Sequence, residues 1–359
     1  MRPFFASFVA TVAVVAVCVL TADPAHRWTR RIRVNALPRE PGQVMVHPPD
    51  IDERELKLHL LRGRSPQIVL LGSSRVMSVT AGMFGASKGT VLNLGVSGAS
   101  AEDYVAFWQA LKESGELPQK VVVYVDPWVF NKNRDQSRWV TNRALVGRFL
   151  EESGAGLVTR ATIAAAAAKA RSDEVTDLLS WVSLRSAGSA LVTGSKSYEV
   201  RLTDESSMAP TESGTRWDGS HVYEERRRKI LPIADIEQLA REYALAPTVY
   251  SLRDFEPDAQ AHLLVRALFE SMTRSAVDVL VVMPPYQPTT LELMRERPAT
   301  RLALETYARE LEQLRIETHV AICNALDPAT SACGAAEFMD GMHPLPSCNE
   351  KVLRGCLSR

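Results

Sequence analysis

The stretch Ile68-Val69-Leu70-Leu71-Gly72-Ser73-Ser74-Arg75 decides how the rest of the chain is interpreted. Its four apolar residues are branched and continuous, which is typical of a strand buried on both faces of a parallel sheet. A turn of small residues follows at once, so a serine hydroxyl is expected at the carboxyl end of that strand. Ligands bind at this edge in open α/β sheets. An ordinary polar turn after a buried strand fits the motif equally well.

Further apolar runs alternate with segments of helical spacing. Strands are predicted at Thr90–Leu94, Lys120–Val125, Val277–Met283 and Thr318–Ile322, and helices at Asp50–Leu61, Ala101–Glu113, Pro257–Arg274 and Leu291–Leu314. This alternation predicts an α/β fold with a parallel sheet of about five strands and right-handed crossovers. From about 132 to 255 the alternation stops, and we expect a mostly helical insertion that caps the sheet.

The first segment predicts a membrane anchor. Pro3–Ala22 holds no charged residue and is long enough to cross a bilayer as a helix, so residues 1–22 are assigned to a transmembrane signal anchor. A cleaved signal peptide is the alternative. Residues 23–50 contain five prolines and are expected to form a linker to a domain at 51–359. The protein is thus expected at the inner membrane as a single-pass protein, with its domain in the periplasm or outside the cell.

Charge and cysteine content exclude some function classes. Lys plus Arg equals Asp plus Glu at 42 each, so the overall charge gives no sign of nucleic-acid binding. Four cysteines lie near the carboxyl terminus without a C-x-x-C pair, which favours two disulfides over a zinc site. Three pairings are possible; as a guess we take neighbours, Cys323 with Cys333 and Cys348 with Cys356. No metal or cofactor is expected.

A serine becomes a nucleophile when a histidine takes its proton and a carboxylate orients that histidine. Asp-x-x-His occurs three times, at Asp23/His26, Asp218/His221 and Asp340/His343. The first pair lies beside the predicted anchor, and the second lies in the insertion. Only the third pair follows the last predicted strand, where its loop should reach the same sheet edge as Ser74.

These blocks resemble the SGNH, or GDSL-like, hydrolases and acyltransferases. More narrowly, they are similar to the membrane-anchored DltD-like proteins and the related alginate acetylation proteins. The resemblance covers about 65–131 and 277–345 and implies a three-layer α/β/α sandwich of the SGNH or flavodoxin-like kind. It rests on the N-terminal anchor and on five blocks: Gly72-Ser73-Ser74, Gly95, Asp126-Pro127-Trp128, Met283-Pro284-Pro285 and Asp340-Gly341-Met342-His343.

The resemblance implies roles for individual residues. Ser74 would be the nucleophile, His343 the general base and then the general acid, and Asp340 the residue that orients it. The backbone N–H groups of Ser74 and Gly95 would line the oxyanion hole. The usual Gly-x-Asn-Asp block after the third strand is missing, and Asn131 is the candidate for the third donor.

Five residues near this edge are candidates for substrate contact, each with a structural alternative. Arg75 would hold an anionic group or a sugar hydroxyl, or else be a surface charge. Trp128 and Tyr286 would stack on a sugar ring, or else pack in the core. Trp217 and His221 would reach the substrate from a loop of the insertion, or else be solvated.

The function implied is serine acyl transfer: O-acylation, and in particular O-acetylation, of a cell-surface or secreted polysaccharide through an acyl-Ser74 intermediate. A membrane-bound O-acyltransferase is the expected partner that supplies the acyl group. A carbohydrate or lipid esterase is the nearest alternative, because water would then attack the same intermediate. The other alternative is a non-catalytic scaffold that binds polysaccharide or docks an acyltransferase.

Overall fold

The computed structural model describes residues 37–47, 51–85, 90–134, 137–154, 200–246 and 248–358, with a few positions between 161 and 168. The predicted anchor and most of the predicted linker lie outside these ranges. Within them, no helix combines the length and the apolar character needed to cross a membrane.

The strands are β1 (Gln43–Val46), β2 (Ile68–Leu71), β3 (Val91–Asn93), β4 (Lys120–Tyr124), β5 (Arg201–Asp204), β6 (Gly214–Arg216), β7 (His221–Val222), β8 (Asp278–Met283) and β9 (Ala321–Asn324). The helices are α2 (Glu53–Leu61), α3 (Ala101–Ser114), α4 (Arg143–Glu152), α7 (Glu225–Arg228), α8 (Ile233–Leu245), α9 (Ala259–Arg274), α10 (Pro288–Glu296), α11 (Pro298–Thr318) and α12 (Pro346–Leu357).

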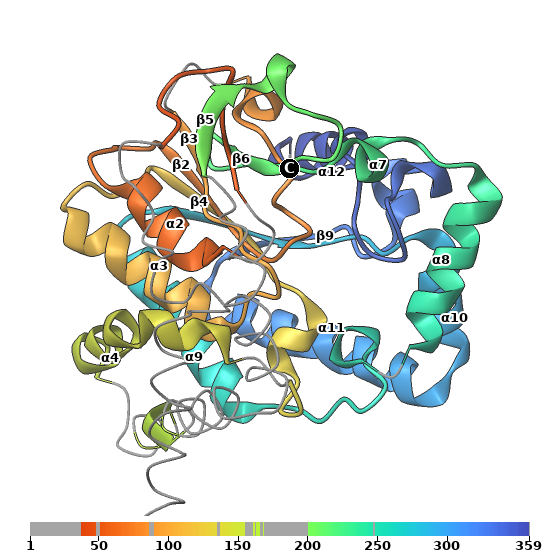
Figure 1. The fold of residues 1–359 in the computed structure, drawn as a ribbon. Coiled ribbons are helices and arrows are strands. Elements are labelled where there is room, and N and C mark those ends of the chain that lie inside the picture. The colour runs from red at the N-terminus through yellow and green to blue at the C-terminus, as the bar shows by residue number, and fades with distance from the viewer. Residues whose placement is uncertain are drawn as a thin grey trace, which may run out of the picture.

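The main sheet has five parallel strands in the order β3-β2-β4-β8-β9 (Figure 1). Its register is continuous: Leu70 lies opposite Asn93 on one side and Val122 on the other. The α/β fold with a five-stranded parallel sheet is therefore confirmed. The chain adds β3 on one side of β2 and then crosses to add β4 on the other side. Because β2, β3 and β4 are neighbours and parallel, the loops that follow them leave the same edge of the sheet close together.

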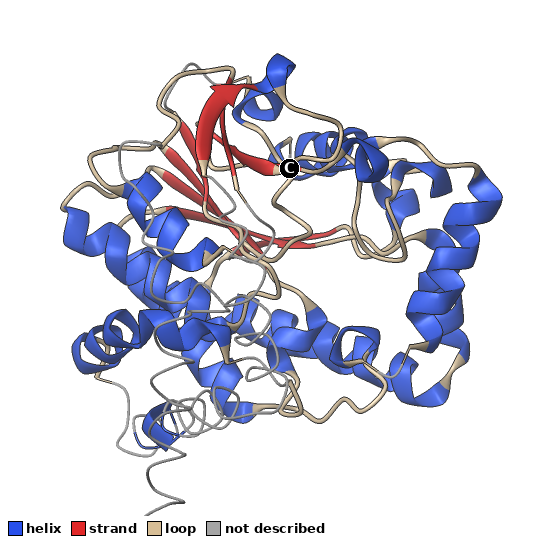
Figure 2. Cartoon of the chain, viewed as in Figure 1, coloured by secondary structure: helices blue, strands red, loops and turns tan. Residues whose placement is uncertain are grey.

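Alternate residues of each strand enter two separate cores, which explains the continuous apolar runs. Val69, Leu71, Val121 and Val123 pack with α3, α9 and α11 on one face. The neighbouring residues of the same strands pack on the other face with α12. Figure 2 shows helices on both sides of the red sheet, so the strands are buried from both sides.

The predicted long helix at Leu291–Leu314 is two helices. α10 ends at Glu296, and α11 begins at Pro298. Proline has no N–H and disfavours helical backbone in the residue before it, so a helix can begin at Pro298 but cannot run through it. The prediction of one continuous helix was wrong for this reason.

A second, antiparallel sheet joins segments that lie far apart in the chain. Its order is β5-β1-β6-β7, and β1 pairs with β5 and β6 from the insertion. The predicted linker is therefore wrong for Gln43–Val46, and the predicted helical insertion holds three strands besides its helices. Strands of two to four residues give too short a pattern to recognise, and β1 has its partners more than 150 residues away.

The second sheet is fastened to the end of β3. The N–H of Asn93 donates to the carbonyl of Asp218 in the β6–β7 turn, at 2.7 Å. The buried Lys57 ammonium donates to the carbonyls of Asn93 and Gly219. Gly219 has φ +80°, and a Cβ there would collide with the backbone of Asn93. The hairpin turn can approach the main sheet this closely only because Gly219 lacks a side chain.

Two disulfides hold the carboxyl-terminal part of the chain, as expected, but the guessed pairing was wrong. Cys323 on β9 is bonded to Cys356, and Cys333 is bonded to Cys348. Both Cys348 and Cys356 lie on α12, and eight residues of helix span about 12 Å. That is farther than a disulfide reaches, so these neighbours cannot pair with each other. The bonds indicate an oxidising compartment, either periplasmic or extracellular.

Replacing Cys333 and Cys348 together by alanine is expected to destabilise the protein by about 3 kcal/mol, because the bond closes a loop of 15 residues. Urea unfolding of the two proteins under oxidising conditions measures the difference. The loop also contains Asp340 and His343, so the positions of these two residues depend on the same bond. An unchanged unfolding midpoint would contradict the predicted contribution of this bond.

Candidate active site

Ser74, His343 and Asp340 form a continuous chain of hydrogen bonds. The Oγ of Ser74 lies 2.8 Å from Nε2 of His343, and Nδ1 of His343 lies 2.7 Å from Oδ2 of Asp340. Ser74 follows β2, and the other two residues come from the loop before α12, so 269 positions separate the serine from the histidine. A hydroxyl, an imidazole and a carboxylate in this order can activate the hydroxyl as a nucleophile.

The Asp340 carboxylate is held in its charged form. Burial alone would raise its pKa, but the adjacent imidazole of His343 and the backbone N–H groups of Met342 and His343 outweigh burial and lower the pKa well below its usual range. Those two N–H groups each donate to Oδ1 at 2.9 Å. The carboxylate is thus fixed by its own loop before it contacts the imidazole.

Replacing Asp340 by asparagine is expected to lower kcat by about 10³- to 10⁴-fold with little loss of stability. The amide oxygen can still accept the two backbone N–H groups, whereas the amide nitrogen would face Nδ1 and force the wrong imidazole tautomer. Turnover of an activated acetyl ester and thermal unfolding, measured on the same preparations, test this. A variant within tenfold of the parent would show that Asp340 does not orient His343.

Close packing explains the glycines on either side of the serine loop. A Cβ at Gly72 or Gly95 would lie within 3 Å of the Val76 side chain. Asn93 then fixes the loop, because its side-chain N–H groups donate to the carbonyls of Val76 and Val79. Ser74 is therefore presented by a turn that is packed against the ends of β2 and β3.

One of the three predicted oxyanion donors is already used within the protein. The N–H of Ser74 makes no hydrogen bond within the described ranges, so it is available to a substrate oxygen. The N–H of Gly95 donates to Oδ1 of Asn93 at 2.9 Å and is already used. The side chain of Asn131 is buried and accepts from the backbone of Asn133 and Glu256. Gly95 therefore offers no free donor to Ser74, whereas Nδ2 of Asn131 has no partner in the described ranges but belongs to a buried side chain that does not line the cavity at Ser74.

The Arg75 side chain turns into the protein and not toward the surface, contrary to prediction. Its side chain is fully buried, pairs with Asp126 at 2.9 Å and donates to the carbonyl of Pro285. The guanidinium also lies 4.4 Å from the centroid of the Tyr286 ring. Arg75 thus turns inward from the serine loop and links the ends of β4 and β8.

Two of the four predicted aromatic and imidazole contacts lie in the core. Trp128 and Tyr286 are fully buried, and the edge of one ring meets the face of the other between Trp128 and Tyr250. Trp217 packs against the core on the α12 side of the sheet. Core packing, the structural alternative, accounts for Trp128 and Tyr286, whereas Trp217 is half-buried. Of the four, only His221 lines the cavity at Ser74.

A cavity of about 330 Å³ opens at Ser74, between the main sheet and the second sheet. Its lining is mostly polar, with Met77 as the one aliphatic side chain among the described residues that line it. The lining residues are His47, Glu53, Ser74, Met77, Ser97, Ser213, His221, Tyr223, Glu224, Arg227 and His343. The insertion therefore supplies one wall of the site.

Several of these residues were missed from the sequence. Glu53 starts α2 and accepts hydrogen bonds from the N–H and the hydroxyl of Ser97. Tyr223 donates its hydroxyl to the carbonyl of Ser74 at 3.2 Å. Each comes from a segment without a recognisable motif. The only signal was the second Asp-x-x-His, whose Asp218 fixes the hairpin turn while His221 reaches the cavity.

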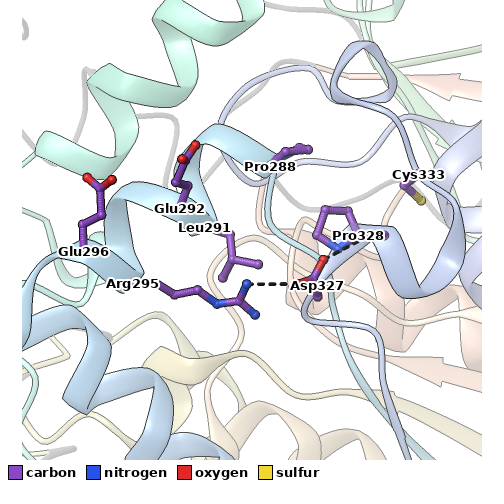
Figure 3. A pocket seen from close by; sticks show the side chains of 9 residues that line it. Pro288, Leu291, Glu292, Arg295, Glu296, Asp327, Pro328 and Cys333 are labelled. Carbon is purple, nitrogen blue, oxygen red and sulfur yellow. Dashed lines mark hydrogen bonds and ion pairs between the residues drawn. The ribbon is translucent and has the colours of Figure 1, made fainter.

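A second pocket of about 390 Å³ lies along α10, away from these residues (Figure 3). It is open, and the ion pair between Arg295 and Asp327 crosses it at 3.0 Å. It holds no pairing of a nucleophile with a base. In the described ranges, no group of three His, Cys, Asp or Glu side chains is arranged to hold a metal ion.

Comparison of the chain with protein-family models finds no match, and comparison with curated proteins finds no similar sequence.

Proposed function

We propose that the protein is a serine acyltransferase that acylates a sugar hydroxyl through an acyl-Ser74 intermediate. The observation that carries this proposal is the hydrogen-bonded chain from Ser74 through His343 to Asp340, which opens into a polar cavity. His343 would accept the proton of Ser74 as Oγ attacks the acyl carbonyl. It would return that proton to the leaving group, and the acceptor hydroxyl would then attack the acyl-enzyme in the same way.

The cavity supports a short acyl group and a polar acceptor. Its lining of hydroxyl, carboxylate, imidazole and guanidinium groups matches the hydrogen bonds of a carbohydrate better than those of a lipid chain. We take acetyl as the acyl group of the proposal, in line with the acetylation proteins that the sequence resembles. The likeness to SGNH acyltransferases, the anchor at 1–22 and a membrane-bound O-acyltransferase as acyl donor belong to the same proposal. The disulfides agree with a site outside the cytoplasm.

The proposal is tested by separating the two halves of the reaction. The protein is mixed with 4-nitrophenyl acetate, and intact-protein mass spectrometry followed by peptide mapping is expected to find an acetyl group on Ser74. Adding an oligosaccharide should then give an acetylated sugar in preference to free acetate. Acetate as the main product at saturating oligosaccharide would make the protein an esterase. If Ser74 carries no acetyl group, the proposal is contradicted, and the alternative of a non-catalytic scaffold is favoured.

A further inference from the structure

The cavity holds few free hydrogen-bond donors on the backbone beside Ser74. The N–H groups of the loop after β3 are used within the protein: that of Gly95 by Asn93, that of Val96 by the carbonyl of Gly72, and that of Ser97 by Glu53. Acyl transfer needs more than one donor at the carbonyl oxygen, because each donor stabilises the charge that develops there. With these three N–H groups occupied, a side chain that lines the cavity is the source we consider for a further donor.

His221 is held in a fixed position in this cavity. Its backbone N–H donates to the carbonyl of Met77 at 2.7 Å, which ties β7 to the turn that carries Ser74. Its ring meets the Tyr223 ring edge to face at 4.6 Å, and the Tyr223 hydroxyl donates to the carbonyl of Ser74. The imidazole is therefore positioned relative to Ser74 through two independent connections.

The surroundings of His221 keep its imidazole neutral. Burial, and then the positive charges of Lys57, Arg216 and Arg227 and the nearby His47, lower its pKa well below the ordinary value of 6.5. These groups come from α2, β6, α7 and the residue after β1, while Glu53, Glu224 and His343 line the same cavity. A neutral imidazole carries one N–H and one lone pair.

The position of the proton follows from the burial of Nδ1. This nitrogen is enclosed by protein and has no hydrogen-bond partner in the described ranges. An N–H buried without an acceptor is costly, whereas a lone pair among cationic neighbours is favourable. The proton therefore belongs on Nε2, which is not enclosed in the same way.

We propose that His221 donates a hydrogen bond from Nε2 to an oxygen atom of the substrate bound at Ser74. The donor comes from the second sheet and would take the part that the resemblance assigns to an asparagine after the third strand. This inference rests on the proposed function, since it names a further binding group of the same site. The oxygen is either the acyl carbonyl or the acceptor hydroxyl, and rate measurements distinguish the two.

Two variants test the donor. His221→Phe keeps a ring and removes the donor, and should slow the affected step by about 10²-fold. His221→Gln keeps an N–H group and should recover part of that loss. Slower acylation of Ser74 identifies the acyl carbonyl, and slower transfer alone identifies the acceptor. His59→Gln is the control, because His59 lies on α2 outside the cavity. Acylation and transfer within twofold of the parent in His221→Phe would overturn the inference.

The tautomer tests the position of the proton on the His221 ring independently of activity. The ¹⁵N spectrum of histidine-labelled protein should show one imidazole neutral and protonated on Nε2 at pH 6, and this signal should be absent from His221→Gln. A charged ring, or a proton on Nδ1, would overturn the inference even if activity falls. Failure of the proposed function looks different, because Ser74 of the parent protein would then not be acylated at all.

Discussion

Replacing Ser74 by alanine is expected to reduce turnover of an acetyl ester by at least about 10³-fold, because the hydroxyl that His343 contacts is the atom that would become acylated. Stability should change little, since the side chain lies on a turn and the substitution removes mainly its hydrogen bond to His343. Initial rates with 4-nitrophenyl acetate, together with labelling by a fluorophosphonate probe, measure the effect.

The adjacent serine provides a matched control. Ser73 is fully buried, and its hydroxyl accepts the N–H of Arg75 within the turn. Ser73→Ala should therefore keep fluorophosphonate labelling and reduce activity only modestly. If labelling survives in Ser74→Ala but disappears in Ser73→Ala, the nucleophile is Ser73, and the proposed mechanism is contradicted.

Removing the charge of Asp126 is expected to produce the largest loss of stability. Asp126→Asn leaves the guanidinium of Arg75 fully buried without its counter-charge, which costs about 3–5 kcal/mol. Chemical unfolding with urea measures the difference. Local disorder of the serine loop should follow, because Arg75 directly follows Ser74 and holds the ends of β4 and β8 together.

The double variant Arg75→Met/Asp126→Leu distinguishes the contribution of the ion pair from the cost of an unpaired charge. Replacing both partners by apolar residues avoids an unpaired buried charge and should restore most of the stability that Asp126→Asn removes. Nε of Arg75 and Oδ2 of Asp126 have no partner in the described ranges, so the pair is only partly satisfied by hydrogen bonds. A double variant less stable than Asp126→Asn would mean that the pair contributes favourable energy of its own.

The main sheet could be predicted because each of its strands carries its own pattern. The runs at Ile68–Leu71 and Lys120–Tyr124 are mostly apolar on both faces. They form neighbouring parallel strands of the main sheet. The second sheet could not be predicted, because β1 pairs with strands of the insertion through backbone groups that every residue has. The pattern of apolar and polar residues within one strand does not indicate which distant strand it pairs with.

The residues of the candidate site fall into two groups: those that a local motif predicts, and those that only the fold brings to the site. Ser74, Asp340 and His343 were found because their chemistry requires those residue types after known strands. Arg75 was misjudged because a sequence does not show that its side chain turns inward to Asp126. Glu53 and Tyr223 were missed because a carboxylate and a phenol in ordinary surroundings carry no signal until the fold brings them to one cavity.

The Cys333–Cys348 bond makes the maturation of the site depend on the order of events after synthesis. Asp340 and His343 lie in the loop that this bond closes, whereas Ser74 follows β2 and lies outside that loop. In a newly made, reduced chain no covalent bond would restrict this loop, and His343 would sample more positions relative to Ser74. Oxidation then restricts the loop, so the hydrogen bond between Ser74 and His343 is expected to form fully only in the oxidising compartment that the disulfides indicate.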